Sequence, residues 1–123
     1  MTEKHLLLVD DTPEVLNSLE KVLSKYYTVS TARDAEQALQ VLEEDGPFDL
    51  ALVDYAMPGQ NGIELIQEIK KRYSTTQSIL LTSHSDPETV MTALSESAIN
   101  KYLMKPVASQ KLLDVIEEML ESA

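Results

Sequence analysis

Four apolar segments of the chain each end on polar residues of the kind that phosphoryl transfer requires. Carboxylates follow two of these segments, a hydroxyl group follows a third and an amine follows the fourth. In chain order the residues are Asp10 and Asp11, Asp54, Thr82, and Lys105. If the four segments are parallel strands of one sheet, their carboxyl ends share one edge, which is where open α/β sheets bind ligands. Such a set of groups in one small volume would suit a metal ion and a phosphoryl group.

Asp10, Asp11 and Asp54 are the candidate metal ligands. Repulsion among three carboxylates would raise at least one pKa unless a cation bound there. Mg²⁺ is the natural candidate, because it takes one or two carboxylates and completes its shell with waters and phosphoryl oxygens. The alternative is that Asp10 and Asp11 simply close a strand before a helix. Thr12 already provides a helix cap, however, so this alternative leaves two adjacent carboxylates without a structural reason.

Asp54 and Lys105 are the candidate reactive groups. Asp54 follows the segment that we expect to be most buried, and a carboxylate beside Mg²⁺ can act as a nucleophile that forms an aspartyl phosphate. An ordinary turn aspartate is the alternative. Lys105 could be a surface lysine, but Pro106 keeps it out of helical geometry and permits a cis bond that would direct the chain. A fixed ammonium group there would stabilise charge on an acyl phosphate. Thr82 alone is an ordinary strand residue.

The elements that must position these residues alternate between apolar strand-like runs and amphipathic helical runs. This pattern predicts βαβ units and a parallel sheet. Right-handed crossovers leave few topologies for five strands, and the order 2-1-3-4-5 is a common one. We therefore predict an α/β, flavodoxin-like (βα)5 three-layer sandwich with strands 1 and 3 as neighbours. The expected strands are 5–9, 27–31, 49–53, 77–82 and 101–104, and the expected helices are 13–25, 34–45, 62–73, 86–97 and 109–121.

The composition restricts the classes of partner. The 123 residues suit one domain, which we expect to span residues 1–123. The net charge of −11 and the aromatic content of 5% argue against unaided nucleic-acid binding. No apolar stretch approaches the roughly 20 residues of a membrane span, the amino terminus has no signal-peptide pattern, and there is no cysteine. We expect a cytoplasmic protein whose partners offer basic or apolar protein surfaces.

The motifs together resemble the receiver domain of two-component response regulators over the whole chain. The resemblance implies that Asp54 accepts a phosphoryl group from a histidine kinase or a histidine phosphotransfer protein. It implies that Asp11, Asp54 and the backbone carbonyl of Ala56 bind Mg²⁺ directly, that Asp10 acts largely through water, and that Lys105 contacts the phosphoryl oxygens. The matching pieces are Leu8-Val9-Asp10-Asp11, Asp54 with Met57-Pro58-Gly59 and Gly62, Leu81-Thr82-Ser83, and Tyr102-Leu103-Met104-Lys105-Pro106.

The resemblance also implies a conformational switch. Thr82 would move towards the phosphoryl group and Tyr102 would turn inward behind it. That coupled movement would remodel a partner surface made of residues 86–97, 101–104 and 109–121. The downstream partner would be a separate effector protein or an output domain missing from this chain.

Two other functions compete with this prediction. A Mg²⁺-dependent phosphatase similar to the haloacid-dehalogenase-like enzymes needs a second aspartate two residues after the nucleophile, where this chain has Ala56. A phosphorylation-independent interaction module, or pseudo-receiver, typically lacks one of the acidic, threonine or lysine positions, and all of them are present. We therefore predict a phosphorylation-activated switch that catalyses its own phosphorylation and dephosphorylation but is not a turnover enzyme.

Overall fold

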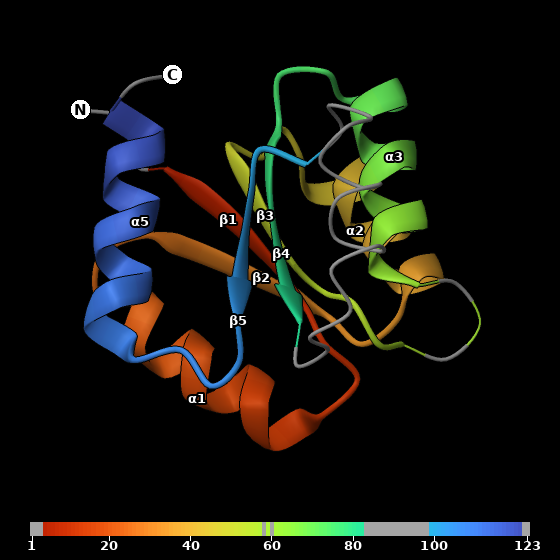
Figure 1. Cartoon of the computed structure of the whole chain (residues 1–123). Coiled ribbons are helices and arrows are strands. Elements are labelled where there is room, and N and C mark those ends of the chain that lie inside the picture. Colours follow the sequence, from red (N-terminus) through yellow and green to blue (C-terminus); the bar gives the residue numbers. More distant parts are fainter. Residues whose placement is uncertain (1–3, 58, 60, 83–98, 122–123) are drawn as a thin grey trace.

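A five-stranded parallel sheet forms the centre of the molecule (Figure 1). The computed structural model describes residues 4–57, 59, 61–82 and 99–121. The strand order is β2-β1-β3-β4-β5, so the predicted order 2-1-3-4-5 is confirmed. The strands are β1 (His5–Val9), β2 (Thr28–Ala32), β3 (Leu50–Asp54), β4 (Gln77–Thr82) and β5 (Lys101–Met104).

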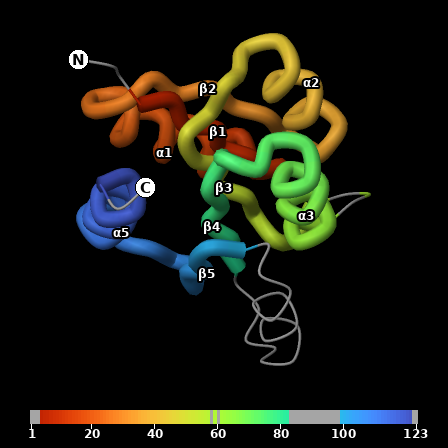
Figure 2. Tube along the Cα trace, turned by 90° about the horizontal axis from the view of Figure 1, so that it is seen from above, coloured from red at the N-terminus to blue at the C-terminus, as the bar shows by residue number. Residues whose placement is uncertain are grey.

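Helices cover both faces of this sheet and make the predicted three layers. Figure 2 shows α1 and α5 on one side of the strands and α2 and α3 on the other. The helix predicted at 86–97 lies outside the described residues. The described helices are α1 (Pro13–Leu23), α2 (Ala35–Asp45), α3 (Gly62–Arg72) and α5 (Ser109–Glu121).

Alternating side chains of the central strands supply two apolar cores. Along β1, Leu6 and Leu8 pack with α1 and α5, whereas Leu7 and Val9 pack with α2 and α3. All five residues of β3 are buried, as the continuous apolar run predicts for a strand covered on both faces. Burial on both faces leaves these strands little freedom to shift in register, because a slip of one residue would exchange the two cores. The two cores therefore fix where each strand ends.

Eleven of the eighteen predicted boundaries of the described elements are confirmed, and the other seven differ by one or two residues. The strands β2 and β3 each lie one residue later than expected, so Asp54 is the last residue of β3 rather than the residue after it. Asp34 precedes α2 as an extended N-cap whose carboxylate accepts a hydrogen bond from the Gln37 N–H group at 2.7 Å. The first helix ends at Leu23, because the Leu23 carbonyl accepts turn hydrogen bonds from the backbone N–H groups of Tyr26 and Tyr27. No helix among the described residues is long and apolar enough to span a membrane.

Candidate functional site

The predicted site residues meet at the carboxyl edge of the sheet. Asp10 directly follows β1, Asp54 ends β3 and Thr82 ends β4, while Lys105 directly follows β5. The strand register places these positions side by side, since Val9 pairs with Val53, Asp54 with Leu81, and Thr82 with Met104. The structure thus brings together residues that are up to 95 positions apart in the chain.

Three carboxylates form a cluster at this edge. Carboxylate oxygens of Asp10, Asp11 and Asp54 lie within 4.8 Å of one another. Asp10 is 2% exposed and Asp54 is 6% exposed, whereas Asp11 is exposed. The cluster therefore has two buried carboxylates and one that opens it to solvent.

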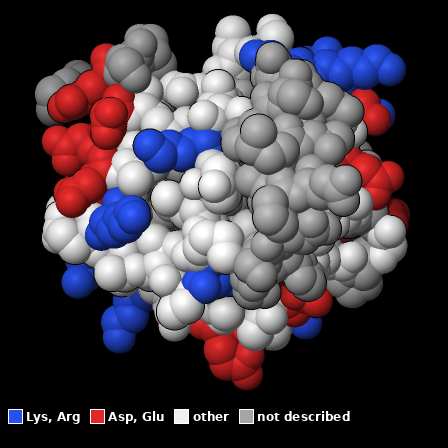
Figure 3. Space-filling view, in the orientation of Figure 1, with Lys and Arg blue, Asp and Glu red and all other residues white. Residues whose placement is uncertain are grey.

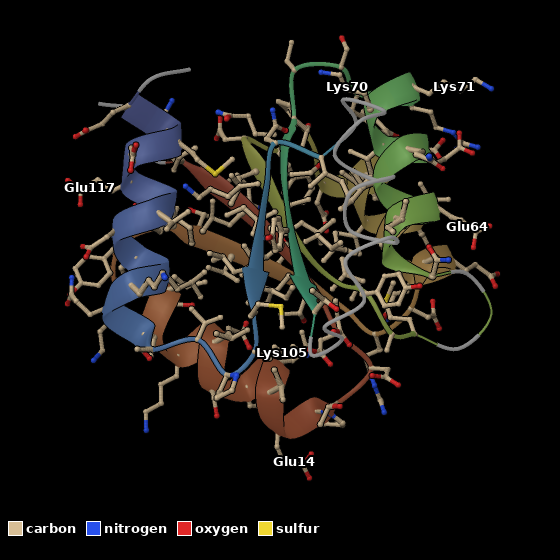
Figure 4. The ribbon with its side chains drawn as sticks, viewed as in Figure 1. Glu14, Glu64, Lys70, Lys71, Lys105 and Glu117 are labelled. Carbon is tan, nitrogen blue, oxygen red and sulfur yellow. The ribbon has the colours of Figure 1, made fainter. Side chains whose placement is uncertain are left out.

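The Lys105 ammonium group bridges the two buried carboxylates. Its Nζ atom lies 2.9 Å from Asp54 Oδ1 and 3.1 Å from Asp10 Oδ2. The Lys105 N–H group also donates to the carbonyl of Thr82 at 2.9 Å, which continues the pairing of β5 with β4 up to this residue. The peptide bond from Lys105 to Pro106 is cis. Figure 4 shows Lys105 at the end of β5, below the sheet.

Asp10 also has a local structural role that the sequence interpretation assigned elsewhere. Its Oδ1 atom accepts a hydrogen bond from the Thr12 N–H group at 2.9 Å. Thr12 does occupy the N-cap position of α1, but its side chain makes no capping hydrogen bond, so the predicted cap is wrong in its chemistry. One carboxylate oxygen of Asp10 thus accepts a hydrogen bond from the Thr12 N–H group, and the other contacts the Lys105 ammonium group. Among the described residues, Asp11 has neither a hydrogen bond nor an ion pair.

Burial and charge together shift the proton equilibria of the site. The pKa of Asp54 is raised, first by burial and then by the charges of Asp10 and Asp11, while Lys105 acts in the opposite direction. Burial alone would lower the pKa of Lys105, but hydrogen bonds and charge interactions with Asp54 and Asp10 outweigh it and raise that pKa. The sequence predicted a raised carboxyl pKa from mutual repulsion. The direction is confirmed, and burial is its largest cause.

The connection from β3 to α3 is built closely around Asp54. A Cβ atom on Gly62 would overlap the backbone oxygen of Asp54 and crowd Tyr55, so only glycine fits there. The helix then begins with a capping box, in which the Asn61 side chain accepts from the Glu64 N–H group and the Glu64 side chain accepts from the Asn61 N–H group. The predicted helix start at residue 62 is confirmed, but the sequence analysis gave no packing reason for the glycine there. The spacing of Asn61 and Glu64 is the sequence signal of the capping box.

Of the residues predicted to form the switch, Thr82 lies at this edge, whereas Tyr102 lies farther back along β5, where it pairs with Leu80. Thr82 is buried at the end of β4, and Tyr102 on β5 is 38% exposed. Ala56 is exposed in the loop after β3. Ser83 and residues 86–97 of the predicted partner surface lie outside the described residues. The roles of Thr82, Tyr102 and Ala56 therefore stay predictions.

Comparison with known proteins identifies the family. The model of the response regulator receiver domain family matches residues 6–117. The transcriptional regulatory protein GlrR of Escherichia coli K12 is 36% identical over 121 residues, which cover 97% of this chain and 27% of that protein. The chain spans between 20% and 30% of the length of the first curated relatives that it matches.

Solved structures give the same result. The signal receiver domain of an HD domain-containing protein from Pseudomonas fluorescens Pf-5 is similar with a TM-score of 0.92 and 36% identity, covering 98% of this chain and 97% of that one. The response regulator protein TrrA of Thermotoga maritima, in complex with Mg(2+)-BeF, is similar with a TM-score of 0.82 and 32% identity, covering 94% and 98% of the two chains. This chain therefore belongs to the receiver domain family of two-component response regulators.

Proposed function

We propose that Asp54 is the phosphoryl acceptor of this signalling switch. The observation that carries the proposal is the bridge from Lys105 to the buried carboxylates of Asp54 and Asp10, with Asp11 beside them at the solvent-facing side. In the reaction, the P–N bond of a donor phosphohistidine breaks with its electron pair going to the imidazole, and a P–O bond to an Asp54 carboxylate oxygen forms. A nucleophilic carboxylate of this kind needs cationic groups near the transferred phosphoryl group.

The donor set of the site fits Mg²⁺. Three carboxylates face one ammonium group, so the cluster carries excess negative charge when all three are ionised. Asp11, with no partner among the described residues, and Asp54 would hold the ion together with the backbone carbonyl of Ala56. Asp10 would act through water, because its two oxygens already contact Thr12 and Lys105. When bound, Mg²⁺ would neutralise charge between the acceptor carboxylate and the phosphoryl oxygens.

The residues of the chain then respond to the new charge on Asp54. Lys105 keeps its ammonium group beside the modified carboxylate and contacts the phosphoryl oxygens, and the Thr82 hydroxyl group donates to one of them. Tyr102, which is 38% exposed in this structure, turns inward behind Thr82. A modification of this kind biases an element with two conformations, here the partner surface that includes β5 and α5.

The partners follow from this role. A histidine kinase or a histidine phosphotransfer protein supplies the phosphoryl group, and an effector protein or an output domain receives the signal. The curated relatives are several times longer than this chain, which supports an output domain in at least some of them. We further propose a single receiver domain over residues 1–123 that is cytoplasmic, binds no nucleic acid directly and is not a turnover enzyme.

Both competing functions are less consistent with this site. Ala56 stands where a phosphatase of the haloacid-dehalogenase kind needs its second aspartate. A pseudo-receiver has no need of a lysine held between two buried carboxylates, and such an arrangement costs desolvation energy. The retained arrangement of Asp10, Asp54 and Lys105 therefore supports phosphoryl chemistry.

Intact-mass measurement after incubation with Mg²⁺ and acetyl phosphate tests the proposal. We expect one phosphoryl increment on the wild-type chain and on the Asp49→Asn control, which changes the carboxylate that directly precedes the same strand. Asp54→Asn should take no increment, and chelation of the metal should abolish the reaction. An increment that survives Asp54→Asn would contradict the assignment. If no adduct is seen, beryllofluoride binding distinguishes a short-lived phosphoryl group from an inactive site.

A further inference from the structure

A polar groove of about 810 Å³ lies beside the acid cluster, over the first turn of α2. Asp11 and Arg33 both line it. The backbone explains their proximity, because the Asp10 N–H group donates to the Ala32 carbonyl at 3.1 Å at the end of the β1–β2 pairing. Asp11, the second residue after β1, and Arg33, the first residue after β2, therefore both line the groove at the carboxyl edge of the sheet.

The guanidinium group of Arg33 has no hydrogen bond or ion pair among the described residues, and its side chain is exposed. Its backbone is held, since the Arg33 N–H group donates to Gln37 Oε1 at 2.6 Å. The start of α2 is already capped by Asp34, whose carboxylate accepts a hydrogen bond from the Gln37 N–H group at 2.7 Å. The positive charge available in the groove is therefore that of the Arg33 side chain rather than that of the helix terminus.

Arg33 is the one cation among the described residues that line the groove, and the charged residues beside it are acidic: Asp11, Asp34 and Glu36. The chain as a whole carries a net charge of −11. A phosphoryl donor brings further negative charge, so its approach to Asp54 is opposed by most of this surface. A cation at the groove wall reduces this electrostatic repulsion locally. A guanidinium group can also donate paired hydrogen bonds to phosphoryl oxygens.

We infer that Arg33 is a specificity-determining residue for the phosphoryl donor: it draws a dianionic acyl phosphate into the groove beside Asp11, ahead of transfer to Asp54. The inference rests on the proposed acceptor role of Asp54. In that transfer the bond between phosphorus and the acyl oxygen breaks, its electron pair leaves with the carboxylate product, and a P–O bond to Asp54 forms. Arg33 takes part in no covalent step.

The test is the rate at which acetyl phosphate phosphorylates the chain, followed by intact mass at saturating Mg²⁺ and low ionic strength. Arg33→Gln should lower the second-order rate constant about three- to tenfold, as expected for removing one unit charge several ångströms from a dianion. The loss should come as a higher half-saturating donor concentration with little change in the limiting rate. Arg33→Lys, which keeps the charge, should stay within about twofold of the wild-type rate.

Lys71→Gln is the matched control for net charge. Lys70, Lys71 and Arg72 form the last turn of α3, and basic side chains appear there at the upper right of Figure 3. Figure 4 places Lys71 at the opposite end of the molecule from Lys105. This control should leave the rate within about twofold of the wild type, because a charge at the far end of the molecule interacts with the donor much more weakly than a charge at the groove wall. Raising the salt concentration should bring the rates of the wild type and Arg33→Gln together.

Three results would overturn the inference. Equal rates for the wild type and Arg33→Gln would remove any role for this side chain. An equal loss in Lys71→Gln would show that only net charge matters, and an equal loss in Arg33→Lys would show that packing rather than charge is affected. The proposed function fails separately: in that case the wild-type chain itself takes no phosphoryl increment, and the inference falls with it.

Discussion

An aspartate lies at each end of β3, Asp49 directly before the strand and Asp54 as its last residue, and the two sites are built in opposite ways. At the amino end, the Asp49 side chain is 40% exposed, accepts the His5 N–H group at 2.8 Å and lies 4.0 Å from Lys4 Nζ. At the carboxyl end, the Asp54 side chain is 8% exposed and shares one ammonium group with a second buried carboxylate. The first site has a partner for each charge, and the second has more carboxylates than cations.

This difference supports our proposal that the carboxyl end of the sheet is the reactive one. Polar groups near the amino end of β3 are satisfied locally, as when the Thr76 hydroxyl group donates to the Phe48 carbonyl at 2.9 Å. The carboxyl end keeps three carboxylates around one ammonium group, and we expect their repulsion to lower the stability of the metal-free fold. Departures from local consistency of this kind are expected at functional sites. The two ends therefore allow matched pairs of substitutions that separate stability from function.

The largest effect is expected from the two tightly packed glycines. A Cβ atom on Gly62 would overlap the backbone oxygen of Asp54, and one on Gly46, near the amino end of β3, would overlap the backbone oxygen of Leu42. Each change to alanine should lower the free energy of unfolding by about 2–3 kcal/mol, measured by urea denaturation. Only Gly62→Ala should also slow phosphorylation of the remaining folded protein. Equal phosphorylation rates in the two variants would contradict the claim that only the carboxyl end of β3 serves the reaction.

A smaller loss is expected on removing the lysine at each end. Lys105→Gln leaves Asp10 and Asp54 buried together without their cation, and it should cost about 1–2 kcal/mol near neutral pH, since Lys105 is itself partly exposed. Lys4→Gln should cost less than about 0.5 kcal/mol, as for other exposed pairs. Phosphorylation should fall about a hundredfold in the first variant alone. Denaturation curves measure the free energy of unfolding, and intact-mass kinetics measure the phosphorylation rate. Comparable losses of either quantity in Lys105→Gln and Lys4→Gln would count against the account.

The pH dependence of stability gives the subtlest test. Because the folded-state pKa of Asp54 is raised, the folded protein holds this proton more strongly than the unfolded chain does. Stability from this group is therefore lost as the pH rises from the unfolded-state pKa, near 3.8, through the folded-state pKa. Metal-free Asp54→Asn should consequently be more stable than the wild type near neutral pH, and the gain should shrink on acidification. Asp49→Asn should show no such gain in urea denaturation at several pH values.

Mg²⁺ should make the wild type more stable than Asp54→Asn, which is the reverse of the order expected without metal. An ion that binds only the folded state adds about 1.4 kcal/mol when its concentration is ten times its Kd. The wild type and Asp49→Asn should gain this stability, while Asp54→Asn should gain less. Thermal unfolding with and without Mg²⁺ measures the difference, and an equal gain in all three proteins would place the ion away from Asp54.

The sequence was sufficient for the fold and for which residues gather at the site. Each apolar run ended on a polar residue, and parallel strands necessarily bring such ends together, so the grouping of Asp10, Asp54, Thr82 and Lys105 followed from strand order alone. Element ends were less predictable. They depend on single hydrogen bonds, such as the one from Gln37 to Asp34, that shift a boundary by a residue.

Side-chain partners could not be predicted in the same way. The sequence analysis predicted that the Thr12 side chain caps α1. In the structure the Asp10 carboxylate instead accepts a hydrogen bond from the Thr12 N–H group, which leaves only its other oxygen for Lys105. The Lys105 bridge depends on rotamers of residues 95 positions apart. The close approach of Gly62 to Asp54 depends on the path of a loop, which no periodic pattern encodes.

The most direct test of the central claim is to locate the phosphoryl group within a single peptide. Reduction of an acyl phosphate with borohydride converts the modified aspartate to homoserine, and cleavage after Arg33 and Lys70 yields one peptide, residues 34–70, that contains both Asp49 and Asp54. Fragment-ion sequencing of this peptide after treatment with acetyl phosphate and Mg²⁺ should find homoserine at position 54 alone. Homoserine at position 49, or at Asp10 or Asp11 in the peptide of residues 5–21, would contradict the account.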